Sequence, residues 1–134
     1  MFKRTIETYF LEWKNRQKRK PLVIRGARQV GKTSAVNLFA HEYFNAYIYI
    51  NLELEDNLAL FSRMNPVHDL LQAIQLKFNK KIIPGETLIF IDEVQNSSIA
   101  MNQLRYFYEE MPGLHVVAAG SLLEVKMKTE GFSF

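Results

Sequence analysis

The stretch Gly26-Ala27-Arg28-Gln29-Val30-Gly31-Lys32-Thr33 decides the fold of this chain. It fits the pattern G-x-x-x-x-G-K-[ST], the phosphate-binding loop known as Walker A. The four residues before it, Leu22–Arg25, are mostly apolar or β-branched and predict a buried strand. Residues 33–44 after it carry apolar side chains at helical spacing and predict a helix. The loop therefore joins a strand to a helix, which is the context that the motif requires.

The residue types of this loop suit the binding of a polyphosphate. Glycines let the backbone fold so that several N–H groups point into one small volume, and the helix adds the positive end of its dipole. The ammonium of Lys32 can reach the β- and γ-phosphates, and the hydroxyl of Thr33 can ligate Mg²⁺. The predicted phosphate-binding residues are the loop and the residue after it: Gly26, Ala27, Arg28, Gln29, Val30, Gly31, Lys32, Thr33 and Ser34.

A second motif lies about sixty residues further on. Residues 87–91, Thr-Leu-Ile-Phe-Ile, predict a buried strand that runs directly into Asp92 and Glu93, the Walker B pattern. A parallel strand delivers its carboxyl end to the crevice where ligands bind in open α/β sheets. There Asp92 can hold Mg²⁺ together with Thr33, and Glu93 can accept a proton from an attacking water. The alternative is a strand that simply ends in two surface acids.

Two more strands are predicted, over residues 46–52 and 114–119. Gly120 and Ser121 follow the last strand, and they either contact the γ-phosphate or form an ordinary turn. Helices are predicted over residues 5–16, over the segment that follows Asn65 as N-cap with Pro66 at its first position, and over a segment between residues 100 and 111. Residues 53–56 are predicted to form an acidic loop. Alternating strands and helices indicate an α/β fold with a parallel sheet.

The first helix has an apolar stripe formed by Ile6, Tyr9, Phe10 and Trp13. Two interpretations are open: the stripe packs on the core beside the sheet, or part of it borders the nucleotide base. The segment Lys14–Lys20 that follows has five basic residues of seven. It is either a solvated helix end and loop or a surface that contacts the phosphates of nucleic acid.

The bulk properties set wider limits. The chain has 134 residues, 48% of them hydrophobic and 23% charged, which is typical of a single globular domain. It has no cysteine, which excludes a disulfide framework and thiolate metal sites. No apolar run approaches the ~18 residues that a transmembrane helix needs, and no signal peptide is recognisable. We expect a cytoplasmic location without a membrane partner.

Three segments together carry a family resemblance. Residues 25–33, 90–95 and 118–123 resemble the AAA-type ATPase domain of a large group of poorly characterised prokaryotic ATPases, in which a C-terminal domain of unknown function follows. The resemblance implies ATP or ADP with Mg²⁺ as ligands and a three-layer P-loop NTPase sandwich with a mainly parallel sheet of strand order 2-3-4-1. It also implies that Ser121 is a sensor and that Asn51 is a polar switch residue acting on the catalytic Glu93. Residues 1–20 are then an N-terminal helix and basic loop, and residues 21–134 the P-loop domain.

The sequence also departs from the family pattern. Such domains continue with a fifth strand beside the first and a helical lid that carries an arginine finger, and we expect this chain to lack both and to be the front part of a longer protein. The missing C-terminal domain, or a second copy of the chain in a homo-oligomer, is then an expected partner. No arginine follows Arg105, so weak hydrolysis by the isolated chain is expected.

Two classes of function remain open on these grounds. One is a Mg²⁺-dependent ATPase module, and the other is a nucleotide-binding switch or assembly module with little turnover. A small-molecule kinase is less favoured, because Glu93 directly after Asp92 suits the activation of water.

Overall fold

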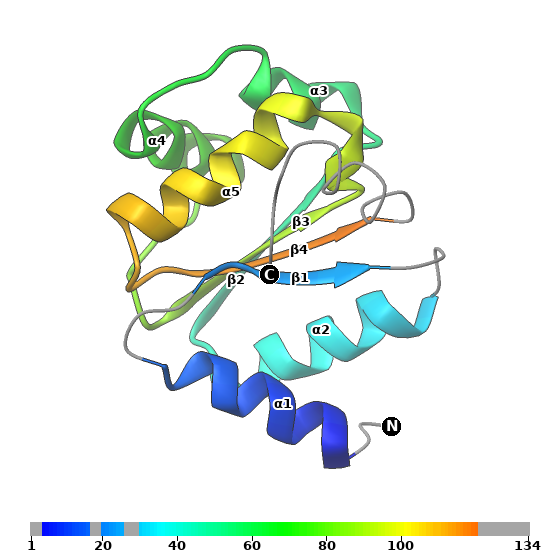
Figure 1. Ribbon diagram of the computed structural model, residues 1–134. Coiled ribbons are helices and arrows are strands. Elements are labelled where there is room, and N and C mark those ends of the chain that lie inside the picture. The colour runs from blue at the N-terminus through cyan, green and yellow to red at the C-terminus, as the bar shows by residue number, and fades with distance from the viewer. Residues whose placement is uncertain (1–3, 17–19, 26–29, 121–134) are drawn as a thin grey trace.

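The sheet of this protein has four strands in its described part, and all neighbouring strands are parallel (Figure 1). The computed structural model describes residues 4–16, 20–25 and 30–120. The strands are β1 (Leu22–Arg25), β2 (Ala46–Asn51), β3 (Thr87–Asp92) and β4 (His115–Gly120). Their order, β1-β4-β3-β2, is the predicted order 2-3-4-1 read from the other edge. The α/β fold and the strand order are therefore confirmed.

Helices cover both faces of the sheet (Figure 1). One face carries α1 (Arg4–Lys14) and α2 (Val30–Tyr43). The other carries α4 (Val67–Phe78) and α5 (Ser98–Glu110), with three short elements near them. These are α3 (Glu55–Leu58) and the 3₁₀ turns η1 (Ala59–Phe61) and η2 (Val94–Asn96). The result is the three-layer sandwich that a parallel sheet needs to bury both of its faces.

Strand β3 shows how the sequence produces two cores. Side chains alternate between the two faces of a strand. Leu88 and Phe90 accordingly belong to the cluster under α1 and α2, whereas Ile89 and Ile91 belong to the cluster under α4 and α5. All four side chains are completely buried. The continuous apolar run of β3 is thus explained by burial on both faces.

Helix α1 is held to the sheet domain through its last turn. Trp13 is buried, its Nε1–H donates to the Lys20 carbonyl at 2.8 Å, and its ring packs edge-on against His115 of β4. Nε2 of His115 in turn lies 2.9 Å from the Lys14 carbonyl. Phe10 also packs in this core, but Tyr9 is 54% exposed. Part of the predicted apolar stripe therefore faces away from the core, because only a narrow face of α1 meets α2 and the sheet.

The sequence predicts Asn65 as the N-cap of α4, and this prediction is wrong by one residue. Pro66 itself is the N-cap, and the helix begins at Val67. Proline fixes only φ, and Pro66 has an extended ψ of 146°. The Asn65 side chain turns back to the Arg63 carbonyl, and the Asn65 carbonyl accepts a bond from Gln103 of α5. One face of this helix packs into the core, since Val67, Leu70, Leu71 and Ile74 are buried.

The acidic loop predicted after β2 is also wrong, because this segment contains α3 and η1. Its acidic side chains Glu55 and Asp56 are exposed, as expected. Two other residues anchor the segment: Phe61 is buried in the core, and Nδ2 of the buried Asn57 donates to the Asn51 carbonyl at 2.9 Å. The run is too short for a helical period to be recognised in the sequence.

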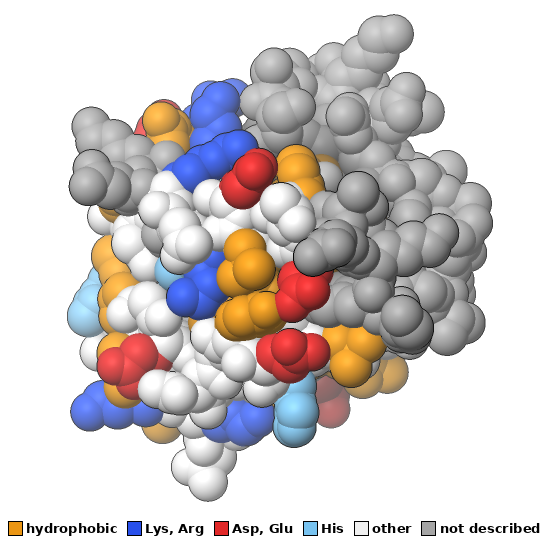
Figure 2. All heavy atoms as spheres, turned by 90° about the horizontal axis from the view of Figure 1, so that it is seen from below, with side chains coloured by type: hydrophobic (Ala, Val, Ile, Leu, Met, Phe, Trp, Pro, Cys, Tyr) orange, Lys and Arg blue, Asp and Glu red, His pale blue; other side chains and the backbone are white. Residues whose placement is uncertain are grey.

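The outer face of α1 and α2 carries mixed charge. Figure 2 views the molecule from this side. In the described part of this face, a few hydrophobic side chains lie among acidic and basic ones. Leu38 of α2 and Tyr9 of α1 are among the exposed large apolar side chains. Scattered apolar side chains of this kind are usual on a protein surface.

A hydrogen bond between α1 and α2 generates a prediction on pH dependence. The Tyr43 hydroxyl donates to the Glu7 carboxylate. This bond, some desolvation and the negative charges of Glu7 and Glu42 raise the pKa of Tyr43 from 10.0 to about 12. A raised pKa means that the stabilisation is fully present below pH 10 and is lost as the pH rises towards 12. We expect wild type to be more stable than Tyr43→Phe at neutral pH, and the difference to vanish over that range.

Urea unfolding at a series of pH values measures this difference, with tyrosinate absorbance followed in parallel. Tyr106→Phe, which removes the hydroxyl of an exposed tyrosine on α5, is the matched control. A stability difference that stayed constant from neutral pH to pH 12 would contradict the assignment of the pKa shift to this bond.

Candidate functional site

The carboxyl ends of three strands meet at one edge of the sheet. Arg25, the last residue of β1, pairs with Gly120, the last residue of β4, and Asp92 at the end of β3 pairs with Ala119. Adjacent strands lie about 4.8 Å apart, so the ends of β1 and β3 are about 10 Å from each other. The predicted phosphate-binding loop follows β1 in the sequence and leads into α2, whose N-terminus lies at the same edge (Figure 1). The two sequence motifs are therefore brought to one place by the strand order.

Asp92 lies on the face of β3 that α2 covers. It has the same parity as Leu88 and Phe90, which pack under α2. The Tyr49 hydroxyl of β2 donates to Asp92 Oδ2 at 2.6 Å, and the Glu93 backbone N–H donates to Oδ1 at 2.9 Å. Burial and the hydrogen bond to Asp92 raise the pKa of Tyr49 above its ordinary value, so its hydroxyl keeps its proton and acts as a donor. These two bonds hold the Asp92 carboxylate in one orientation.

Glu93 has an unusual backbone and a buried side chain. Its φ of 55° and ψ of 44° lie in the left-handed region, a conformation that costs a residue with a side chain about 1–2 kcal/mol. Among the described residues other than glycine, only Asn79 shares a positive φ. The Glu93 side chain is 6% exposed, and its Oε1 accepts a 2.8 Å bond from Gln95 Nε2. Strained backbone that holds a buried carboxylate is typical of a functional site.

Gln95 lies between Glu93 and the end of β4. It belongs to η2 and is 8% exposed, and within the part of the chain that the structure describes its own Oε1 is buried without a hydrogen-bond partner. A Cβ added to Gly120 would lie 1.9 Å from that oxygen and 3.0 Å from Cδ. The Gln95 amide therefore fills the space above Gly120 that a side chain would need.

The structure places the other predicted residues as follows. Asn51 ends β2 beside Asp92, and its Oδ1 accepts a 3.0 Å bond from the Glu53 N–H. Thr33 is partly buried in the first turns of α2, and Ser34 is exposed. Three predicted residues, Val30, Gly31 and Lys32, are described as backbone of α2 but not as side chains. Gly26, Ala27, Arg28, Gln29 and Ser121 lie outside the described residues.

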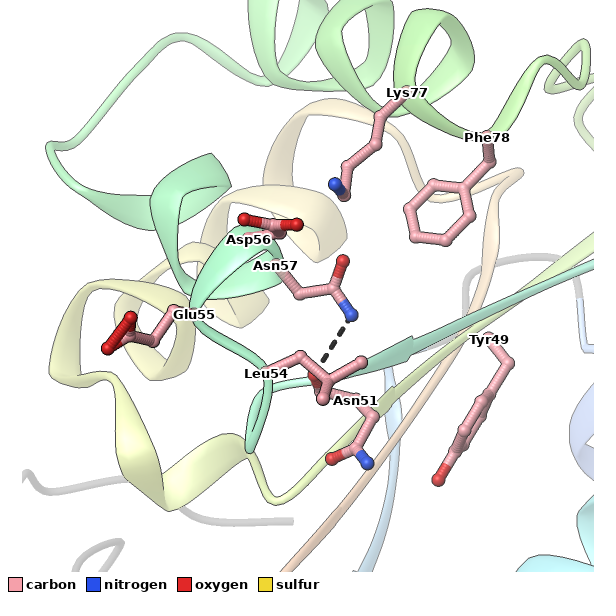
Figure 3. Close-up of a pocket in the computed structure, with 8 residues that line it drawn as sticks. All are labelled: Tyr49, Asn51, Leu54, Glu55, Asp56, Asn57, Lys77 and Phe78. Atoms are coloured by element: carbon pink, nitrogen blue, oxygen red, sulfur yellow. Dashed lines mark hydrogen bonds between the residues drawn. The ribbon is translucent and has the colours of Figure 1, made fainter.

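A groove of about 590 Å³ lies at the free edge of β2, near Asn51 (Figure 3). Figure 3 shows Tyr49 and Asn51 at its base, Leu54 and the α3 residues Glu55 to Asn57 on one side, and Lys77 with Phe78 from the end of α4 on the other. Tyr49 lines this groove and also holds Asp92. The groove therefore adjoins the Asp92 side of the site.

The side chains present fit a magnesium ion held with few protein ligands. A carboxylate and a hydroxyl, from Asp92 and Thr33, are the hard oxygen ligands that Mg²⁺ prefers. Each Asp92 oxygen accepts one of the two bonds above and has a second lone pair for a metal or its water. In the described part of the chain no group of three or more His, Cys, Asp or Glu side chains forms a metal cage. An ion that keeps several of its waters needs no such cage.

Sequence reasoning missed two residues of this site, Tyr49 and Gln95. Tyr49 lies in a continuously apolar strand and so looks like a core residue. Its hydrogen bond to Asp92 depends on how β2 is aligned with β3, and the sequence does not show this alignment. Gln95 lies two residues after Glu93. This spacing indicates a contact between the two side chains only once the 3₁₀ turn η2 is known.

The basic cluster is described only in part. Nζ of Lys14 lies 5.2 Å from the Phe44 ring and Nζ of Lys20 lies 5.7 Å from the Tyr108 ring. Both ammonium groups therefore rest on aromatic faces of their own chain, whereas residues 17–19 lie outside the described part. None of the helices described here combines the length and the apolar character that crossing a bilayer requires.

Comparison with known proteins identifies the family to which this chain belongs. A family model described as an AAA domain matches residues 18–132. The match contains the predicted phosphate-binding loop, Asp92 and Glu93, and all four strands of the described sheet. A search of curated proteins finds no match. The narrower group named by the sequence resemblance stays a prediction.

The left-handed backbone at Glu93 generates a prediction on stability. Glu93→Gly and Glu93→Ala both remove the carboxylate, but only glycine adopts this conformation without strain. We expect Glu93→Gly to be the more stable variant by about 1 kcal/mol, after the greater freedom of glycine in the unfolded chain has offset part of the gain. Urea unfolding of the two variants measures the difference. An alanine variant as stable as the glycine variant would show that the backbone here carries no strain.

Proposed function

Because this chain belongs to the AAA domain family, we propose that it binds ATP and ADP with Mg²⁺ and hydrolyses ATP. The observation that carries the proposal is the meeting of three strand ends, which brings the chain that enters the predicted phosphate-binding loop within about 10 Å of the end of β3, where Asp92 and Glu93 lie. Open parallel sheets bind their ligands at such carboxyl ends.

The proposed roles follow from the position and chemistry of each group. Backbone N–H groups of residues 26–33 and the N-terminus of α2 bind the phosphates, and Lys32 contributes the charge. Thr33 and Asp92 hold Mg²⁺, which when bound neutralises part of the phosphate charge. Tyr49 and the Glu93 N–H keep Asp92 in the orientation that binding requires.

Glu93 is the proposed general base. It follows the metal-binding Asp92 directly, and its buried carboxylate is excluded from bulk water. A carboxylate that is held near the phosphates can take a proton from a water as that water attacks. Ser121, which follows β4 in the sequence, is proposed to sense the nucleotide, and Asn51 at the end of β2 is proposed to influence Glu93. The alternative is a binding module with little turnover, and measurement of phosphate release separates the two functions.

The first test concerns binding. Lys32→Ala removes a charge-assisted contact worth about 1.5–3 kcal/mol, so the affinity for a fluorescent ATP analogue is expected to fall about tenfold or more. Lys81→Ala is the matched control, because Lys81 is exposed and precedes the opposite, amino end of β3. Titration of all three proteins decides. Equal affinities in wild type and Lys32→Ala would refute the phosphate-binding role.

The second test concerns hydrolysis. Glu93→Gln keeps the size of the side chain and removes the base, so nucleotide binding is expected to persist while phosphate release falls about 10²-fold or more. Glu109→Gln, at an exposed position near the far end of α5, is the matched control. Wild-type turnover in Glu93→Gln would exclude Glu93 as the base. Absence of turnover in wild type, with binding intact, would favour the binding module.

A further inference from the structure

Gln95 makes a contact that the proposed catalytic roles do not use. Its Nε2 donates to Glu93 Oε1 at 2.8 Å, and both side chains are more than nine-tenths buried. The nitrogen must be the atom that faces Glu93, since a carboxylate accepts hydrogen bonds and does not donate them. One oxygen of the Glu93 carboxylate is therefore held by a donor from the next turn of the chain.

Packing alone does not explain a glutamine at this position. The Gln95 Oε1 is buried and has no hydrogen-bond partner among the described residues, an arrangement that destabilises the folded state. An apolar side chain of the same size would fill the space without that cost. The benefit must therefore come from the amide nitrogen, whose described partner is Glu93.

Gly120 provides the space that this arrangement needs. The conformation at Gly120 is that of an ordinary strand end, so glycine is not required by its backbone. Glycine is required here by the side-chain amide of Gln95, because a Cβ at residue 120 would lie 1.9 Å from Gln95 Oε1. The nearest atom outside Gln95, the Val94 nitrogen at 3.6 Å from that Cβ, makes an ordinary contact.

We propose that Gln95 is a positioning residue for Glu93, and that Gly120 at the end of β4 leaves the space in which the Gln95 amide does this. The amide fixes the rotation of the Glu93 carboxylate and so directs its lone pairs towards the attacking water. Accepting a proton depends on such alignment. The inference rests on the proposed role of Glu93 as base, and it adds a residue and a strand end on which that role depends.

The kinetic test uses Gln95→Met, which keeps the volume and the burial but removes the donor. We expect kcat to fall about 10–100-fold, as is usual when a group that orients a functional side chain is lost, with KM for ATP and the dissociation constant for ADP unchanged within about twofold. A purely structural role would be preserved by methionine. Gln95→Met with wild-type kcat would overturn the proposal.

The Gly120 test uses a double-mutant cycle. Gly120→Ala displaces the Gln95 amide from the position in which it bonds Glu93, so it should lower kcat by about the same factor as Gln95→Ala. In the double variant Gln95→Ala/Gly120→Ala the atoms that would clash are absent, so the second change should add no further loss. If the decreases in kcat of the two single variants multiplied in the double variant, Gly120 would affect catalysis independently of Gln95. That result would overturn the role proposed for Gly120.

NMR spectroscopy can detect the bond between Gln95 and Glu93 in the absence of nucleotide. The side-chain amide of Gln95 gives its own NMR signals, and in the free protein both Glu93→Ala and Gly120→Ala should shift them, whereas Glu109→Gln should not. Unchanged signals in Glu93→Ala would show that no such bond exists in solution and would overturn the proposal. Failure of the proposed function is recognised differently: wild type itself would release no phosphate, and the catalytic part of this inference would fall with it.

Discussion

The hydrogen-bonded register of β1, β4 and β3 is the constraint on which the site depends. It sets Arg25 beside Gly120 and Asp92 beside Ala119. Segments nearly seventy residues apart in the sequence therefore leave the sheet within about 10 Å of one another. The helices on both faces secure this register, because they bury the alternating side chains of β3 and so prevent a one-residue slip that would turn Asp92 to the other face.

Adjacent residues in the chain can have different roles because their neighbours differ. Asp92 ends a regular strand, is partly exposed, and is held by a hydroxyl from β2. Glu93 leaves the strand through the left-handed region, and this turns its side chain into a buried position next to Gln95 and the end of β4. The backbone strain is thus what separates a partly exposed carboxylate suited to a metal from a buried one suited to proton transfer.

The strands that carry the two motifs could be predicted because they depend on strong local patterns. Apolar runs that stop before Gly26 and before Asp92-Glu93 mark strand ends, and the family resemblance supplied the strand order. The N-cap at Pro66 and the helix α3 were missed, because single-residue capping and one-turn helices leave little periodic signal. Tyr49 and Gln95 were missed for another reason: their partners are fixed by strand register and by one left-handed residue, and neither is visible in composition or spacing.

The segment after β2 shows how the free edge of the sheet supports the site. Backbone groups that point away from β3 are bonded by the chain itself: Lys80 donates to the Tyr47 carbonyl, and Asn57 donates to the Asn51 carbonyl. Such contacts block the pairing of another strand at these positions. They also fix β2 on both sides of Tyr49, whose hydroxyl must reach Asp92 across the strand pair. The short helix α3, which carries Asn57, therefore does more than connect two elements: it helps to keep in place the strand that orients Asp92.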